Sequence, residues 1–169
     1  SFSILNAFEK YLQQNGITLF PVHIKLDTGM HRLGFEPAAT EQLAQQLAAS
    51  TQFKIQSVFS HLAASDSKAH DKFTMQQAEL FAKGCAVLEK YITYPFIKHI
   101  ANTSAIHRHS GLQFDMVRLG IGLYGVDAHE KMQQQLKNVS TLKTTISQIK
   151  KIKKLVPQYR IAFFRKVYI

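Results

Sequence analysis

The chain has 169 residues, of which 46% are hydrophobic and 11% aromatic, a composition typical of a globular domain with its own core. No apolar run approaches the roughly eighteen residues of a membrane-spanning helix. The opening segment SFSILNAFEK lacks the basic start of a secretory signal. We expect the single cysteine, Cys85, to be a buried hydrophobe in a reducing cytoplasm.

The net charge of +10 comes entirely from the last part of the sequence. Residues 1–130 contain 11 basic and 11 acidic residues, whereas residues 131–169 contain 10 basic residues and no acidic one. A uniformly basic domain would indicate phosphate backbones as partners. For this neutral body with a basic end we expect no nucleic acid and no membrane partner. A non-catalytic module whose basic tail binds acidic partners is one alternative.

Helical and strand patterns alternate along the chain. Helices are expected over residues 4–15, before Gly16, and over 40–50 and 72–91. Strands are expected at 21–27, 53–61, 96–105 and 115–125. Strands separated by helices of this length predict βαβ units, a parallel sheet and an α/β fold.

Polar or glycine-rich residues follow each of the four predicted strands, at residues 27–32, 61–66, 102–104 and 118–121. In parallel α/β sheets and barrels, functional groups collect just past the carboxyl ends of the strands. We therefore expect these four segments to form one site.

The first strand end, DTGMHRLG, combines a turn signal with Arg32, whose guanidinium suits a carboxylate or phenolate oxygen. A surface turn with a solvated arginine explains the same residues equally well. Lys25 alternates with Ile24 and Leu26, which in a barrel would point the lysine at the interior. A buried lysine needs a partner or a chemical modification.

The second end presents His61 in FSHLAASD. A lone histidine is more often structural than functional, but this one could stack on a planar cofactor or orient a neighbour through hydrogen bonds.

The third and fourth ends contain the features of an anion site. Asn102, Thr103 and Ser104 offer small polar groups at the start of a helix, where they could cap the helix, hold a phosphate, or both. Arg118 precedes Gly120 in VRLGIGLYG, and glycines allow the backbone to approach a ligand closely. Together the four ends predict a phosphorylated cofactor across the mouth of a half barrel, with no metal.

Four ordered motifs, VHIKLDTGMHRLGF, FSHLAASD, HIANTSA and FDMVRLGIGLYG, resemble those of the alanine racemases. The resemblance covers about residues 1–155. It implies pyridoxal 5'-phosphate bound to a (β/α)8 TIM barrel that is followed by a β-rich domain. It also implies a cytoplasmic homodimer that interconverts L-alanine and D-alanine and supplies D-alanine for peptidoglycan.

The resemblance assigns roles to the charged residues. Arg32 matches the arginine that binds the cofactor's phenolic oxygen and positions the substrate carboxylate. Lys25 matches a lysine that is carbamylated in many members, and His61 matches the histidine beside the cofactor ring. Arg118 matches the arginine facing the pyridine nitrogen, which a guanidinium leaves unprotonated and therefore a weaker electron sink.

The same resemblance assigns the phosphate contacts. Asn102 and Thr103 fall on the usual Asn-Ser pair, so a threonine replaces the phosphate-binding serine and adjacent Ser104 is an alternative donor. Gly120 and Ile121 match backbone contacts to the phosphate.

Departures from the family pattern limit what this polypeptide is expected to do. Neither catalytic base has a match: the lysine that holds the cofactor covalently, and a tyrosine donated by the second subunit. We expect a truncated chain: the later half of the barrel at 1–130, the start of the C-terminal β domain at 131–155 and an atypical tail at 156–169. We expect the chain alone to be inactive. A related fold-type III racemase or aldolase for another amino acid, or a non-catalytic remnant, are the alternatives.

Overall fold

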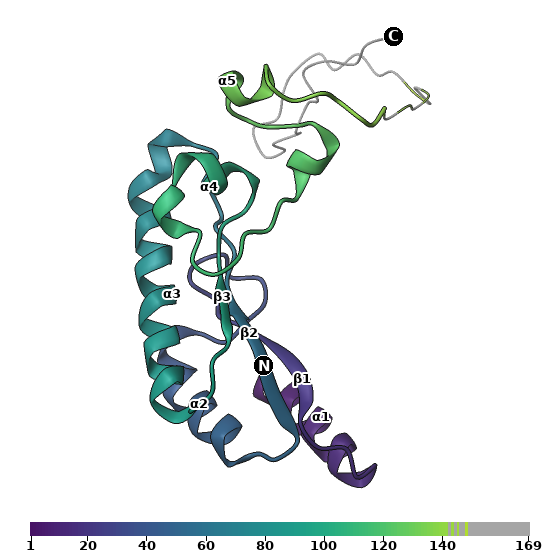
Figure 1. Ribbon diagram of the computed structural model, residues 1–169, viewed down its shortest axis with the longest axis vertical. Helices are drawn as coiled ribbons and strands as arrows, with labels where there is room; N and C mark the ends of the chain where they lie inside the picture. Colours follow the sequence, from purple (N-terminus) through teal and green to yellow (C-terminus); the bar gives the residue numbers. More distant parts are fainter. Residues whose placement is uncertain (142, 144, 146–147, 149–169) are drawn as a thin grey trace.

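The computed structural model describes residues 1–141, 143, 145 and 148. Helices and strands alternate through most of this range, as the sequence predicts (Figure 1). The helices are α1 (Phe2–Gln14), α2 (Thr40–Ala49), α3 (Asp71–Tyr91), α4 (Thr103–Arg108) and α5 (Glu130–Gln133), and the strands are β1 (Phe20–Lys25), β2 (Phe53–Phe59) and β3 (Ile97–His99).

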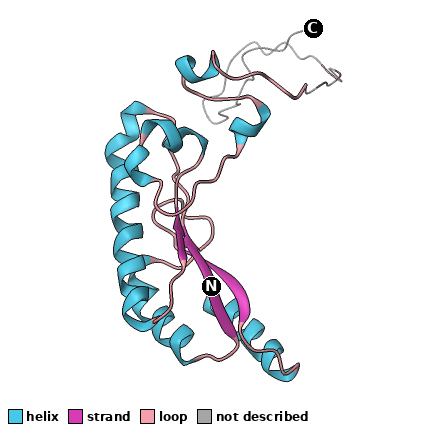
Figure 2. Cartoon of the chain, in the orientation of Figure 1, coloured by secondary structure: helices cyan, strands magenta, loops and turns pink. Residues whose placement is uncertain are grey.

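The three strands form one parallel sheet in the order β1-β2-β3 (Figure 2). Each connection between neighbouring strands contains a helix, which is the βαβ arrangement. The prediction of an α/β fold with a parallel sheet is therefore confirmed.

The core lies between this sheet and the helices α2 and α3, which lie along one face of the sheet in Figure 1. Leu43 of α2 and Phe81 and Leu88 of α3 are fully buried, as are Ile55 and Val58 of β2. Cys85 belongs to the same core, and burial raises the pKa of its thiol to about 12, so it is an inert hydrophobe as predicted.

A β-bulge in the β1–β2 ladder changes which β2 side chains reach the helix-free face of the sheet. Val22 pairs with Ile55 but His23 pairs with Ser57, so Gln56 is the extra residue. Ile55 and Val58 both point into the core although they are three residues apart. The bulge therefore places Ser57 on the opposite face, the one that carries the candidate site.

The prediction of a fourth strand at 115–125 is wrong for the described residues. Two backbone bonds still join this segment to the β3 region, from Asp115 N to Lys98 O (3.1 Å) and from Arg118 N to Ala101 O (3.0 Å). The Asp115 carboxylate takes the Lys98 N–H, and thus replaces the backbone carbonyl that a strand would offer. Residues Ile121–Tyr124 then form a 3-10 turn, η4.

The predicted β domain at 131–155 and the tail at 156–169 fall largely outside the described residues. Of this region, 131–141 contain the end of α5 and irregular backbone. Among the described residues, no helix is long and apolar enough to span a bilayer.

Candidate functional site

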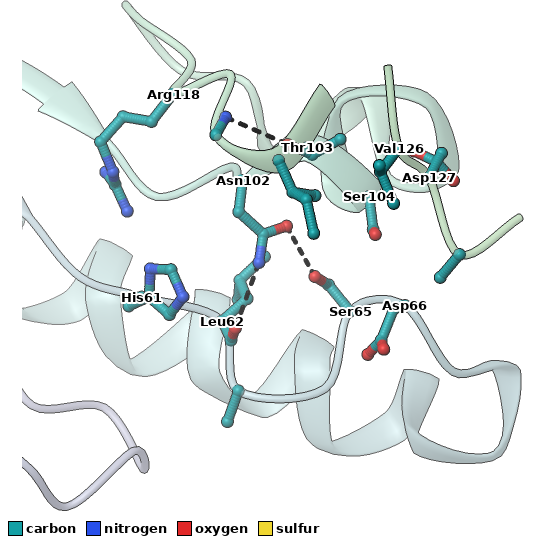
Figure 3. A pocket seen from close by; sticks show the side chains of 14 residues that line it. His61, Leu62, Ser65, Asp66, Asn102, Thr103, Ser104, Arg118, Val126 and Asp127 are labelled. Carbon is teal, nitrogen blue, oxygen red and sulfur yellow. Dashed lines mark hydrogen bonds between the residues drawn. The ribbon is translucent and has the colours of Figure 1, made fainter. Parts of the chain in front are cut away.

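A cavity of about 600 Å³ lies past the carboxyl ends of β2 and β3, where the sequence predicts a site. His61 borders it from the β2 side, and Asn102, Thr103, Arg118 and Gly120 border it from the β3 side (Figure 3). Residues from three of the four predicted segments thus line one hollow. The segment after β1, which carries Arg32, does not line it.

Thr103 connects α4 to the glycine loop before η4. Its Oγ1 accepts hydrogen bonds from Gly120 N (3.1 Å) and Gly122 N (3.2 Å). A Cβ at Gly122 would lie 2.7 Å from Leu119 Cδ1 and 2.9 Å from Thr103 Cγ2, so the loop closes on Thr103 only with glycine there. Because both lone pairs of the hydroxyl are used, its proton is left to donate to a ligand.

Asn102 caps α4 and also fastens the loop that follows β2. Its Oδ1 accepts from Ala105 N (3.2 Å) and from the Ser65 hydroxyl (2.7 Å), while its Nδ2 donates to Leu62 O (3.3 Å). The capping explanation therefore holds for Asn102. The carboxamide joins the second and third strand ends and so determines the shape of the cavity between them.

Two other predicted phosphate contacts lie at the cavity. Ser104 lines it and is 8% exposed, while Ile121 lines it at the start of η4 with 56% of its surface exposed. Their contacts to a ligand stay predictions.

Arg118 crosses the end of the sheet and binds acceptors from both neighbouring segments. Its Nη1 donates to His99 O (3.2 Å) and to His99 Nδ1, and its Nη2 donates to Ser60 O and Ile100 O. Its guanidinium carbon lies 5.5 Å from the centre of the Phe59 ring. Within the described part of the chain, these bonds use only the terminal nitrogens and leave Nε–H for a ligand.

His99 is a site residue that the sequence reasoning missed. Its ring stacks on Phe59 with centroids 5.3 Å apart and accepts a hydrogen bond from Arg118. Burial, Arg118 and His23 lower its pKa to about 4, so the imidazole is neutral at neutral pH. The available signal was its place as the first residue of the HIANTSA motif, where β3 ends.

His61 is held through its backbone by α3. Gln77, which is fully buried, donates from Nε2 to His61 O (3.1 Å) and accepts at Oε1 from Ala63 N (2.9 Å). Gln77 is a second residue that the sequence reasoning missed, because a glutamine in a long helix carries no distinguishing pattern.

The pKa of His61 reflects cations of separate segments. Its pKa is lowered first by burial and then by the positive charges of Arg118, Lys25 and Arg32. Charges from the first strand and its end and from the 118–121 segment thus act on one imidazole. Such a cluster favours an anionic ligand.

Lys25 and Arg32 are more exposed than the sequence reasoning assumed. Lys25 lies on the face opposite buried Ile24 and Leu26, as predicted, but it is only half-buried and Arg32 is exposed. The expectation of a fully buried lysine is therefore wrong here. The reason is that the described residues form one three-stranded sheet, which does not enclose Lys25 as a closed barrel would.

The turn after β1 is rigid although its arginine is exposed. The Asp27 carboxylate accepts from the backbone N–H groups of Gly29, Met30 and His31, at 3.0 to 3.1 Å. These bonds and the nearby His31 hold its pKa below the usual value, against the opposing effect of burial. Thr28 Oγ1 lies 2.7 Å from Ser60 Oγ, which ties the turn to the end of β2.

Two carboxylates also line the cavity, Asp66 and Asp127. Asp127 is buried, and its Oδ1 receives His129 N (2.7 Å) and lies 3.2 Å from His107 Nε2. The sequence reasoning did not include it. The His107 ring and the His129 backbone thus hold this carboxylate at the edge of the cavity.

Comparisons with known proteins find one family and several relatives. The family described as "Alanine racemase, N-terminal domain" matches residues 1–128. Among curated proteins, alanine racemase of Treponema denticola is 35% identical over 154 residues, 89% of this chain and 40% of that protein. Alanine racemase of Prochlorococcus marinus is 38% identical over 111 residues, 63% of this chain and 28% of that protein.

Solved structures of alanine racemases also match the fold of this chain. Alanine racemase of Streptomyces lavendulae superposes with a TM-score of 0.71 at 28% identity, covering 80% of this chain and 36% of that one. The structure of alanine racemase from Bartonella henselae carries covalently bound pyridoxal phosphate. It superposes with a TM-score of 0.68 at 31% identity, covering 82% of this chain and 37% of that one.

The chain therefore spans two fifths or less of the length of these relatives. It covers part of their N-terminal barrel. The ordered motifs, the parallel sheet and the match over residues 1–128 together establish that this chain belongs to the alanine racemase family.

Proposed function

We propose that this chain is part of a pyridoxal 5'-phosphate-dependent alanine racemase, and that its cavity holds the cofactor. The observation that carries the proposal is the polar cradle of Thr103 and the glycine loop, which lies in the same cavity as the Arg118 guanidinium and the His61 ring. The polar cradle suits the phosphate of the cofactor, and the guanidinium and the imidazole suit its planar ring.

The residues present fit the phosphate group. Thr103 has a hydroxyl proton left to donate, and Ser104 and the Ile121 backbone border the same part of the cavity. A side chain at Gly122 would collide with Thr103, so the cradle is built around a backbone that approaches closely. Phosphate oxygens are strong acceptors for such hydroxyl and N–H donors.

The residues present also fit the ring. When bound, the cofactor supplies an electron sink for the negative charge left at Cα of an amino acid after loss of its proton. Arg118 would donate its Nε–H toward the ring nitrogen, and as an obligate donor it cannot transfer a proton to that nitrogen. His61, whose pKa is lowered by burial and by its cationic neighbours, would contact the ring face or edge.

Arg32 and Lys25 would act at the open side of the site. Their charges reach His61, and Arg32 is exposed enough to meet a substrate carboxylate and the phenolic oxygen of the cofactor. Carbamylation of Lys25 would convert it to an anion able to pair with Arg32. Half-burial of Lys25 leaves it accessible to the carbon dioxide that this reaction consumes.

Racemisation requires a base on each side of Cα, one to remove the proton and the other to return one. We propose that the parent protein supplies a lysine and, from a second subunit, a tyrosine. This chain then positions the reactants but performs no turnover alone. In the parent, a cytoplasmic homodimer, the product D-alanine would enter peptidoglycan.

The test compares two proteins. The protein expressed from the complete locus, incubated with pyridoxal 5'-phosphate and L-alanine, is expected to form D-alanine, and Arg118→Ala in it is expected to remove most activity. The purified 169-residue chain is expected to form none. D-alanine formation by the chain alone refutes the assignment of the missing bases. A parent that converts another amino acid but not alanine refutes the substrate and supports a related racemase or aldolase.

A further inference from the structure

Behind Arg118, on the face of the sheet that carries the site, three polar side chains form a continuous hydrogen-bonded row. Ser57 Oγ lies 3.0 Å from His99 Nε2 and 2.7 Å from His23 Nδ1. His99 Nδ1 in turn contacts Arg118. The row crosses all three strands, from β1 through β2 to β3, and ends on the arginine of the cavity.

The direction of both bonds of the His99 ring follows from Arg118. A guanidinium only donates, so His99 Nδ1 must accept and must carry the lone pair. The neutral imidazole then has its proton on Nε2, which donates to Ser57 Oγ. The Ser57 oxygen accepts this bond, and the direction of its 2.7 Å contact with His23 Nδ1 depends on the tautomer of His23. Only one tautomer of His99 satisfies this arrangement.

Burial of Ser57 and His99 makes a change of the His99 tautomer energetically costly. Ser57 is 2% exposed and His99 is 5% exposed, so water cannot replace a lost partner at either group. A His99 proton on Nδ1 would face the Arg118 donor, and a protonated His99 would face its positive charge. Without the serine hydroxyl, the buried Nε2–H would have no acceptor within the row.

The β-bulge explains why Ser57 lies between the two histidines. Regular pairing would place Gln56 opposite His23, but the extra residue brings Ser57 there instead. Ser57 then lies beside both histidines, on the face away from the core, while Val58 fills the core position. Bulges often redirect a side chain next to a functional site.

We propose that Ser57 is a positioning residue of the site: its hydroxyl, between His23 and His99, fixes the His99 tautomer that keeps Arg118 aimed across the cavity. Ser57 touches neither the cavity nor a ligand, and it acts only through His99. The identity of the ligand that Arg118 meets rests on the proposed function, but the arrangement of the row does not.

The test measures the row directly in the complete 169-residue chain without ligand. Long-range proton–nitrogen NMR spectra show which imidazole nitrogen of each histidine carries the proton, and His99→Gln assigns the His99 signals. Nitrogen spectra of the arginine side chains report whether the Arg118 Nη groups rotate freely. In the unaltered chain we expect His99 protonated on Nε2 alone and slow rotation of the Arg118 Nη groups.

Three variants separate positioning from general destabilisation. Ser57→Ala is expected to mix the two His99 tautomers and to release the Arg118 rotation, whereas Ser57→Thr, which keeps the hydroxyl, is expected to restore both signals. Ser60→Ala is the matched control, because Ser60 is equally buried and its hydroxyl bonds Thr28 rather than His99. We expect this control to leave the His99 tautomer unchanged.

Two outcomes overturn the proposal: Ser57→Ala with the same His99 tautomer and Arg118 rotation as the unaltered chain, or Ser60→Ala with the same changes as Ser57→Ala. Titration of the same proteins with pyridoxine 5'-phosphate then tests the functional consequence separately. Weaker binding to Ser57→Ala than to Ser57→Thr supports the role. Absence of binding to every protein removes the proposed cofactor site but leaves the NMR result to decide the row.

Discussion

Thr103 Oγ1 accepts the backbone N–H of Gly120 at 3.1 Å, which joins the start of α4 to the loop after Arg118. The same oxygen accepts from Gly122. One hydroxyl therefore holds together the two segments that sequence motifs assign to phosphate binding. Thr103 therefore joins the two segments of the cradle, and its remaining proton is available to donate to the phosphate that we propose binds there.

Replacement of Thr103 by valine tests this double role. Thr103→Val keeps the side-chain shape but removes the acceptor for two N–H groups and the donor to phosphate. Affinity for pyridoxine 5'-phosphate is expected to fall by about ten- to hundred-fold, the effect of one or two hydrogen bonds to a charged group. Calorimetric titration measures it. Thr103→Ser should bind like the unaltered chain, and equal affinity of the valine variant would show that the hydroxyl is not used.

Gly122→Ala tests the close approach of the loop to α4. The added Cβ would meet Leu119 Cδ1 at 2.7 Å and Thr103 Cγ2 at 2.9 Å, so the loop must move away from the hydroxyl. We expect several-fold weaker binding of pyridoxine 5'-phosphate and loss of the amide protection of Gly120 in hydrogen exchange. Gly111→Ala is the control, since no atom lies within 4 Å of its added Cβ. The same loss in both variants would contradict the steric explanation.

Gln77→Leu tests how α3 holds the loop after β2. The change leaves Ala63 N–H and His61 O without their side-chain partners, and buried unpaired groups cost about 1–3 kcal/mol each. Urea denaturation should show a loss of about 3 kcal/mol in the free energy of unfolding. The exposed neighbour Gln76→Leu should change it by less than about 0.5 kcal/mol. Equal effects in both would mean that the carboxamide does not support His61.

Most of the fold could be predicted from the sequence because local patterns specify it. The apolar spacing of α3 and the alternation around Ile24 and Leu26 depend only on neighbouring residues. The fourth strand was predicted wrongly for a non-local reason. Its apolar residues suit a strand, but the Asp115 side chain takes a ladder bond and the glycines turn the backbone into η4.

The site was predictable as a set of strand ends but not as a network. His61 and Thr103 come to one cavity because parallel strands end on the same side of a sheet, and Arg118 joins them although its segment forms no strand. Gln77 gave no local signal, since its role depends on the packing of α3 against a distant loop. The position of Ser57 could not be predicted because it depends on a β-bulge. A one-residue change of register reverses which face of the sheet a side chain occupies.

The stability of the chain is expected to depend on pH through His99. Its pKa falls from 6.5 to about 4 on folding, chiefly by burial and also by the charge of Arg118. Between these values the unfolded chain binds the proton more readily, so stability rises with pH through this window and is lost as the pH falls below 6.5.

Urea denaturation at a series of pH values measures this dependence, and His99→Gln should flatten it. The remaining slope should come partly from His61, whose pKa is lowered in the same direction. An unchanged slope in His99→Gln would show that the neutral buried imidazole does not contribute.

In the proposed function, the cavity recognises a phosphorylated pyridine ring through Thr103, the glycine loop and Arg118. The most direct measurement is calorimetric titration of the complete chain with pyridoxine 5'-phosphate and with pyridoxine, neither of which has the aldehyde that reacts with surface lysines. We predict one binding site, at least about ten-fold weaker binding without the phosphate, and loss of binding in Arg118→Ala. Equal affinity for the two compounds, or binding unaffected by Arg118→Ala, would contradict the account.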